Sequence, residues 1–156
     1  MENKMKSKVL NRKRVDIVSI KMVKESSFLY ENRKVNSPGD AIELFRRFLS
    51  ESDREQFLVC CMDIKNQPTS INVVSIGTLN SSLVHPREVF KGAILGNSAS
   101  IIVAHNHPSG DPTPSKEDIN ITMRLKEAGK IIGIDILDHV IIGENEHISF
   151  KEKGIL

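Results

Sequence analysis

The chain lacks the features of membrane-spanning and exported proteins. No apolar run reaches the roughly 18 residues of a transmembrane helix, and no apolar core of signal-peptide length follows the basic N-terminus. Cysteine is scarce: Cys60 and Cys61 are the only two, and they form neither a CxxC redox motif nor a zinc-finger spacing. These absences predict a cytoplasmic protein, without a membrane partner, whose cysteines serve packing.

The composition is that of one ordinary globular domain. The 156 residues are 39% hydrophobic and 27% charged, with no internal repeat or low-complexity tract. We expect residues 1–14 to form a flexible basic segment and residues 15–156 to form a single domain.

Positive charge is concentrated near the N-terminus although the net charge is only +2. Eight of the 22 basic residues lie in the first 24 positions: Lys4, Lys6, Lys8, Arg12, Lys13, Arg14, Lys21 and Lys24. Such a cluster could contact nucleic acid. It has no interleaved aromatic residues, so a solvated terminus is the favoured interpretation and nucleic-acid binding the alternative.

Hydrophobic periodicity predicts strands and helices without regular βαβ alternation. Strands are expected at residues 15–23, 56–63, 72–76 and 100–104, followed by two apolar segments at 131–137 and 139–142. Helices are expected after Ser37, His85 and Ser115, the last ending near Gly129. The first two should bury Ile42, Phe45, Phe48 and Leu49, and Val89, Phe90, Ala93 and Ile94, respectively. The pattern favours an α+β or mixed-sheet α/β domain.

A short motif carries the clearest chemistry. His105 and His107 follow a buried strand, where residues two apart share a face. A loop rich in proline then leads to Ser115, at a helix start, and Asp118 follows three residues later. Two imidazoles and one carboxylate, with a fourth position open, form the ligand set of a catalytic zinc site.

Hydrolysis at such a site also needs a general base and a group that stabilises the oxyanion. Glu55, at the start of an apolar strand, and Glu88, in the first turn of a helix, are the two candidates for the base. The helix dipole alone explains a carboxylate at Glu88, but spacing does not choose between them. The Ser115 hydroxyl could donate to the oxyanion.

Each part of the motif also has a structural interpretation. Ser115 and Asp118 fit a capping box, in which they only satisfy helix-end amides. The coincidence of that pair with His105 and His107 favours metal binding. Of the other polar residues, His85 is expected to begin a helix, Asp111 to form a turn and His147 to be exposed. Asp138 and His139 are expected to pack at a strand end, or else to support the metal ligands or add a further ligand.

The motif resembles the JAMM motif of JAB/MPN metalloproteases, and the wider sequence resembles the RadC family. The matching segments are Gly77-Thr78-Leu79-Asn80, His85-Pro86-Arg87-Glu88-Val89-Phe90, Ala104-His105-Asn106-His107-Pro108-Ser109-Gly110-Asp111 and Leu137-Asp138-His139. The similarity covers roughly residues 38–154.

The resemblance implies a cytidine-deaminase-like α/β/α sandwich holding Zn²⁺. It implies that His105, His107 and Asp118 are the ligands, that Ser115 assists the oxyanion, and that Glu55 is the base, with Glu88 in reserve. One departure is Asn106, where eukaryotic JAMM enzymes usually have serine or threonine. The short basic N-terminus is also expected to leave no room for the DNA-binding helix-hairpin-helix region that many RadC proteins carry.

These observations predict a zinc-dependent metallohydrolase of peptide or isopeptide bonds, acting on a peptide or protein substrate. The alternative is a non-catalytic RadC-like module in DNA-repair or mobile-element assemblies that binds nucleic acid or protein. A nucleobase deaminase is not expected, because the HxE…PCxxC signature is absent.

Overall fold

The computed structural model describes residues 12–49, 51–77 and 84–156. Three helices and five strands lie within these ranges. In chain order they are α1 (Pro38–Leu49), β1 (Gln56–Met62), β2 (Pro68–Ile76), α2 (Pro86–Leu95), β3 (Ser100–Asn106), α3 (Lys116–Ile132), β4 (Asp135–Ile142) and β5 (His147–Ser149).

The strands form one mixed sheet in the order β2-β1-β3-β4-β5. β3 and β4 are parallel, and the other neighbouring pairs are antiparallel. The strands predicted at residues 56–63 and 72–76 correspond to β1 and β2, which pair as antiparallel neighbours. The mixed-sheet α/β class is therefore confirmed.

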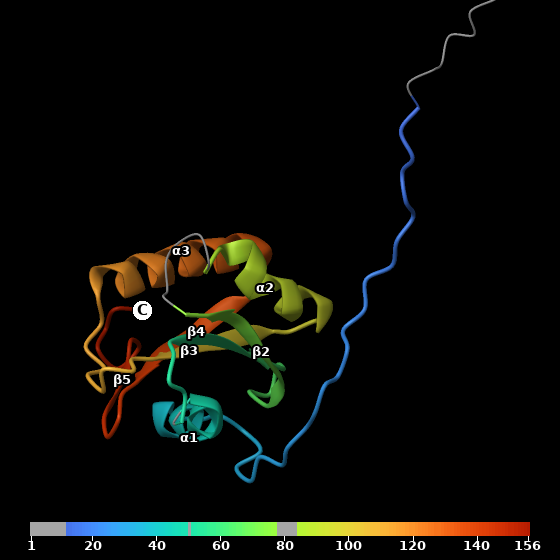
Figure 1. The fold of residues 1–156 in the computed structure, drawn as a ribbon. Helices are drawn as coiled ribbons and strands as arrows, with labels where there is room; N and C mark the ends of the chain where they lie inside the picture. Colours follow the sequence, from blue (N-terminus) through green and yellow to red (C-terminus); the bar gives the residue numbers. More distant parts are fainter. Residues whose placement is uncertain (1–11, 50, 78–83) are drawn as a thin grey trace, which may run out of the picture.

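Helices cover both faces of this sheet. α2 and α3 lie over one face and α1 lies over the other (Figure 1). Successive residues of β1 alternate between the two hydrophobic cores: Phe57, Val59 and Cys61 face one, whereas Leu58, Cys60 and Met62 face the other. This gives the expected three-layer α/β/α arrangement and explains why almost the whole strand is apolar.

Both cysteines are packing residues, as expected. Cys60 and Cys61 are buried on opposite faces of β1, and burial raises the pKa of the Cys60 thiol to about 12. A thiol with so high a pKa is unreactive at neutral pH.

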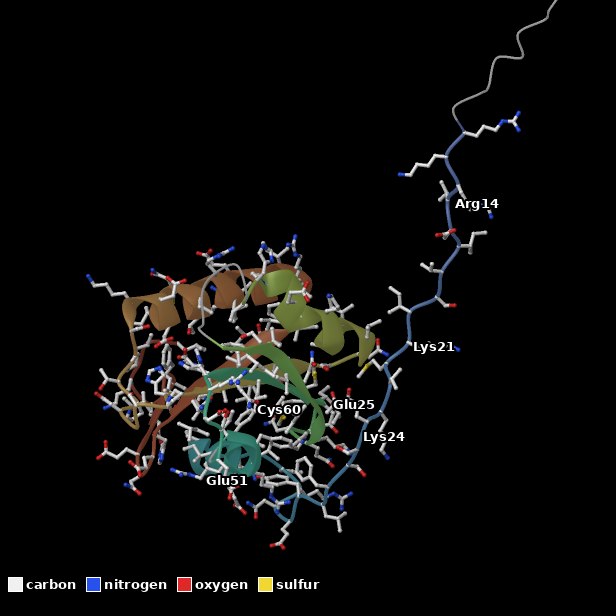
Figure 2. The ribbon with its side chains drawn as sticks, in the orientation of Figure 1. Arg14, Lys21, Lys24, Glu25, Glu51 and Cys60 are labelled. Carbon is white, nitrogen blue, oxygen red and sulfur yellow. The ribbon has the colours of Figure 1, made fainter. Side chains whose placement is uncertain are left out.

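The prediction of a strand at residues 15–23 is wrong. This segment belongs to no helix or strand and is exposed throughout. Figure 2 shows Lys21 on it, with Arg14 and Lys24 next to its two ends, as the chain extends away from the sheet. Alternating residues suit a strand, but a strand also needs a partner, and β2 and β5 form the edges of the sheet without it. Lys4, Lys6 and Lys8 of the basic cluster lie outside the described residues.

Two expected core positions are partly exposed. Phe48 is 37% exposed and Ile94 is 52% exposed, so neither belongs to the buried core. The Phe48 ring instead contacts Phe28 of the preceding segment, with centroids 5.3 Å apart. The other predicted core residues of α1 and α2 are buried.

The predicted end of the last helix was also wrong. α3 continues through Gly129 to Ile132 and ends at Gly133, which adopts φ 82°. Because glycine adopts this left-handed conformation without a steric penalty, Gly133 is a stronger helix stop signal than Gly129. The two apolar segments at 131–137 and 139–142 consequently become the end of α3 and one continuous strand, β4. β5 was not predicted.

Among the described residues, no helix combines the length and the apolar character that a membrane span requires.

Candidate metal centre

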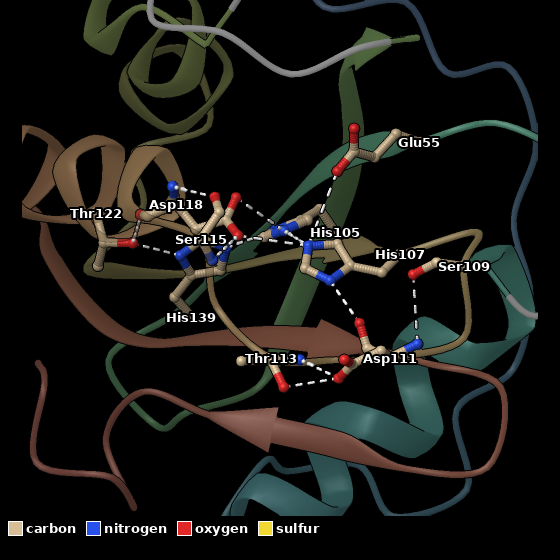
Figure 3. A network of polar contacts seen from close by, with 10 residues as sticks. All are labelled: Glu55, His105, His107, Ser109, Asp111, Thr113, Ser115, Asp118, Thr122 and His139. Carbon is tan, nitrogen blue, oxygen red and sulfur yellow. Dashed lines mark hydrogen bonds and ion pairs between the residues drawn. The ribbon is translucent and has the colours of Figure 1, made fainter.

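Two imidazoles converge where β3 ends. His105 is the penultimate residue of β3 and is fully buried, and His107 directly follows the strand. Their Nε2 atoms are 3.0 Å apart. Nitrogen ligands about 2.0–2.1 Å from a tetrahedral zinc lie about 3.3 Å from each other. The ring arrangement therefore fits a shared metal (Figure 3).

Asp118 in the first turn of α3 meets both rings. Its Oδ1 lies 3.3 Å from Nε2 of His105, and its Oδ2 lies 3.4 Å from Nε2 of His107. Burial favours a raised pKa, but the contacts with the two imidazoles outweigh it and hold the pKa of the Asp118 carboxyl well below its usual range. Asp118 is therefore ionised, as a metal ligand must be.

Ser115 and Asp118 also form a capping box. The Ser115 hydroxyl accepts the amide proton of Asp118 at 3.0 Å, and Asp118 Oδ2 accepts the amide proton of Ser115 at 2.8 Å. The helix cap and the approach to the histidines thus occur together. The Ser115 side chain uses a lone pair in this bond and not its proton.

Glu55, just before β1, lies at the same place. Its Oε1 is 3.8 Å from Nε2 of His107, and ligand atoms of Glu55, His105 and His107 all lie within 4.8 Å of one another. Glu88, the reserve base, instead forms a 2.7 Å hydrogen bond with Lys91, one turn further along α2. The hydrogen bond from Lys91 lowers the pKa of Glu88. The geometry favours Glu55 over Glu88.

Asn106 connects the histidines to the segment that carries Glu55. Its Oδ1 accepts the amide proton of Gln56 at 2.7 Å, and its Nδ2 donates to the carbonyl of Arg54 at 2.9 Å. The main-chain groups on both sides of Glu55 are thus held by one buried side chain. In the sequence, Asn106 differs from the JAMM pattern but gives no sign of this role.

Hydrogen bonds from outside the centre orient both rings. Nδ1 of His107 bonds to the carbonyl of Asp111 at 2.7 Å, and Nδ1 of His105 bonds to Nε2 of His139 at 2.8 Å. Nδ1 of His139 in turn bonds to the Thr122 hydroxyl. Each ligating ring is therefore held by its outer nitrogen, with Nε2 facing the centre.

Two of these histidines have shifted pKa values. Asp118 is the main cause of a raised pKa at His107. Complete burial lowers the pKa of His139 well below its usual range.

His85, Asp111 and His147 match their structural interpretations, whereas Asp138 and His139, expected at a strand end, lie in the middle of β4. The Asp111 carboxylate accepts bonds from the Thr113 amide and hydroxyl within a turn. His85 caps α2, and His147 is exposed. The Asp138 carboxylate accepts bonds from His139, Ser149 and Lys151, tying β4 to the C-terminal segment.

A three-layer sandwich with this group of histidines and carboxylates at one end of its sheet defines a JAB/MPN-type domain. The profile of the family described as "RadC-like JAB domain" matches residues 35–155. The chain therefore belongs to the RadC family.

Two similar proteins illustrate the relationship. One, from Clostridium botulinum (strain Okra / Type B1), is 58% identical over 123 residues, which are 79% of this chain and 54% of that protein. Another, from Methanosarcina barkeri, is 53% identical over 124 residues, or 80% of this chain and 54% of that protein. Both are called UPF0758 proteins, a name that states no activity. The chain spans about half the length of these relatives.

Proposed function

We propose that this protein is a zinc-dependent metallohydrolase that cleaves peptide or isopeptide bonds. The observation that carries the proposal is the convergence of His105, His107 and Asp118, with the Glu55 carboxylate beside them. The donor set of two imidazoles and one ionised carboxylate suits zinc and leaves a fourth position for water or substrate.

Each of the proposed site residues would have its own role in the reaction. His105, His107 and Asp118 would hold the ion, which supplies a Lewis acid and lowers the pKa of water. Glu55 would take a proton from the water that adds to the carbonyl carbon. The Ser115 hydroxyl would donate to the oxyanion. As the carbon–nitrogen bond breaks, Glu55 would return its proton to the leaving amine.

A substitution that removes the proposed general base, Glu55, but leaves the metal ligands intact tests this proposal. Zinc-loaded wild type should cleave members of a peptide and isopeptide library, scored by mass spectrometry. Glu55→Gln should keep its zinc and lose about 10²–10⁴-fold in rate, the usual effect of general acid–base catalysis. Glu88→Gln, which alters a carboxylate that bonds to Lys91 instead of His107, is the matched control and should keep its rate.

Full turnover by Glu55→Gln would refute the role of Glu55 as the general base. A wild type that binds zinc and cleaves nothing would favour the alternative, a non-catalytic nucleic-acid-binding module. One observation supports that alternative: Arg12, Lys13 and Arg14 are exposed on the extended segment. Salt-dependent DNA binding that is lost on removal of residues 1–14 would then be expected.

A further inference from the structure

A line of hydrogen bonds runs behind His105, on the side away from the other proposed ligands. Nδ1 of His105 lies 2.8 Å from Nε2 of His139. Nδ1 of His139 bonds to the Thr122 hydroxyl, which in turn bonds to the carbonyl oxygen of Asp118 at 2.7 Å. All four residues are buried. The line begins and ends at proposed zinc ligands and joins β3, β4 and α3 (Figure 3).

The donor and acceptor of each hydrogen bond can be assigned by starting from the carbonyl oxygen of Asp118, where the line ends. A carbonyl oxygen only accepts, so the Thr122 hydroxyl donates its single proton to Asp118. The Thr122 oxygen must then accept, and the proton in its bond with His139 belongs to Nδ1 of the imidazole. The neutral form of His139 consequently has its lone pair on Nε2, facing His105.

The surroundings of His139 favour this neutral form. Its side chain is wholly buried, with ring centroids 4.5 Å from Phe150 and 5.6 Å from Phe57. An imidazolium between two aromatic rings and away from water is unfavourable. Nε2 of His139 therefore accepts a proton from Nδ1 of His105.

We propose that His139 and Thr122 are positioning residues that keep a proton on Nδ1 of His105, so that its Nε2 lone pair is available to zinc. The inference rests on the proposed zinc site. The Asp118 carboxylate lies 3.3 Å from this Nε2, on the side of the ring where zinc would bind. Zinc would bind the Nε2 lone pair while the proton on Nδ1 stays in place. His107 has a separate support, the carbonyl of Asp111.

Thr122→Val is the sharpest substitution, because it removes the hydroxyl and nearly keeps the shape. Without the hydroxyl, His139 can place its proton on either nitrogen, and His105 loses its fixed tautomer. Zinc affinity, measured by competition with a chromogenic chelator, should fall about 10-fold, the lower end of the range for such supporting residues. Thr122→Ser, which retains a hydroxyl, should restore most of the affinity. Circular dichroism checks that both variants fold.

Nitrogen-15 NMR of the histidine rings tests the same inference without zinc. In the metal-free wild type, Nδ1 should be protonated in both His105 and His139, and Nε2 of His139 should be unprotonated. An unprotonated Nδ1 at His105, or wild-type zinc affinity in folded Thr122→Val, would overturn the inference. If these protonation states are found but wild type takes up no zinc, the proposed zinc site fails while the hydrogen-bond line stands.

Discussion

Asn106 fixes the main chain on both sides of Glu55. The asparagine follows one proposed zinc ligand and precedes the other, and its amide bonds the carbonyl of Arg54 and the N–H of Gln56. β1 and β3 pair with Phe57 opposite His105, which brings Asn106 next to this segment. The position of the proposed base is thus tied directly to that of the proposed ligands.

Asn106→Ala should destabilise the protein. The substitution leaves a main-chain donor and acceptor without their partner in a largely buried place, so we expect a loss of about 1–3 kcal/mol in the free energy of unfolding. Urea denaturation measures this loss. Asn145→Ala, at an exposed position, should change stability by less than about 0.5 kcal/mol. Equal stability of the two variants would contradict the role given to Asn106.

Zinc content is the second prediction. Protein purified without added metal should contain about one zinc per chain by elemental analysis, as one set of three ligands implies. A His105→Ala/His107→Ala double variant should contain none, whereas His147→Ala, altered at an exposed histidine, should keep its zinc. If wild type bound no zinc even when supplied with it, Ser115 and Asp118 would be left as a helix cap.

The third prediction concerns pH in the metal-free protein. Asp118 raises the pKa of His107 above the ordinary 6.5, so this contribution to stability is complete below pH 6.5 and is lost as pH rises through the folded-state pKa. The pKa of Asp118 is lowered, so its own contribution is present above pH 3.8 and is lost as pH falls through the folded-state pKa. The pair should therefore stabilise the fold most between pH 3.8 and 6.5.

NMR titration and unfolding measurements test that window. His107 should titrate above 6.5 in the metal-free wild type, and Asp118→Asn should lower its pKa. The stability difference between wild type and Asp118→Asn should be larger near pH 5.5 than near pH 8.5, a range set by the two shifts. Zinc affinity should rise with pH, because His107 must lose its proton to bind. A His107 pKa unaffected by Asp118→Asn would contradict the ion pair.

The approach of His105, His107 and Asp118 could be predicted because it is local. The end of a strand, a turn rich in proline and a helix start, all within the 14 residues from His105 to Asp118, suffice to bring them together. Glu55 is different: its distance from His107 depends on the pairing of β1 with β3. Sequence spacing does not choose between Glu55 and Glu88. The helix dipole gives Glu88 a structural explanation that Glu55 lacks, and the family resemblance assigns the role of base to Glu55.

The supporting residues depend on features that the sequence does not display. His139 reaches His105 because β4 runs parallel to β3 and places His139 opposite Val103. Residues 15–23 illustrate the opposite case, since their alternation fits a strand but no strand pairs with them. Because the sequence does not display which strands pair, neither the whole fold nor the whole site could be predicted from it.

Gly143, immediately after β4, is the last test of the site. A Cβ here would overlap the carbonyl oxygen of Gly110 and press on Pro112. These residues flank Asp111, whose carbonyl holds Nδ1 of His107. Gly143→Ala should therefore move the loop, release the His107 ring and weaken zinc binding about 10-fold, as loss of an outer hydrogen bond does.

Gly39→Ala provides the comparison for this substitution. A Cβ at Gly39 makes only ordinary contact, 3.6 Å from the Ser37 hydroxyl oxygen, and the residue lies in α1. The Gly39→Ala variant should fold normally and bind zinc as wild type does. The chelator competition assay measures both affinities, and a folded Gly143→Ala protein with the affinity of Gly39→Ala would show that the loop does not set the orientation of His107. Loss of affinity only in Gly143→Ala would mean that close packing of the loop on the end of β4 helps to orient a metal ligand.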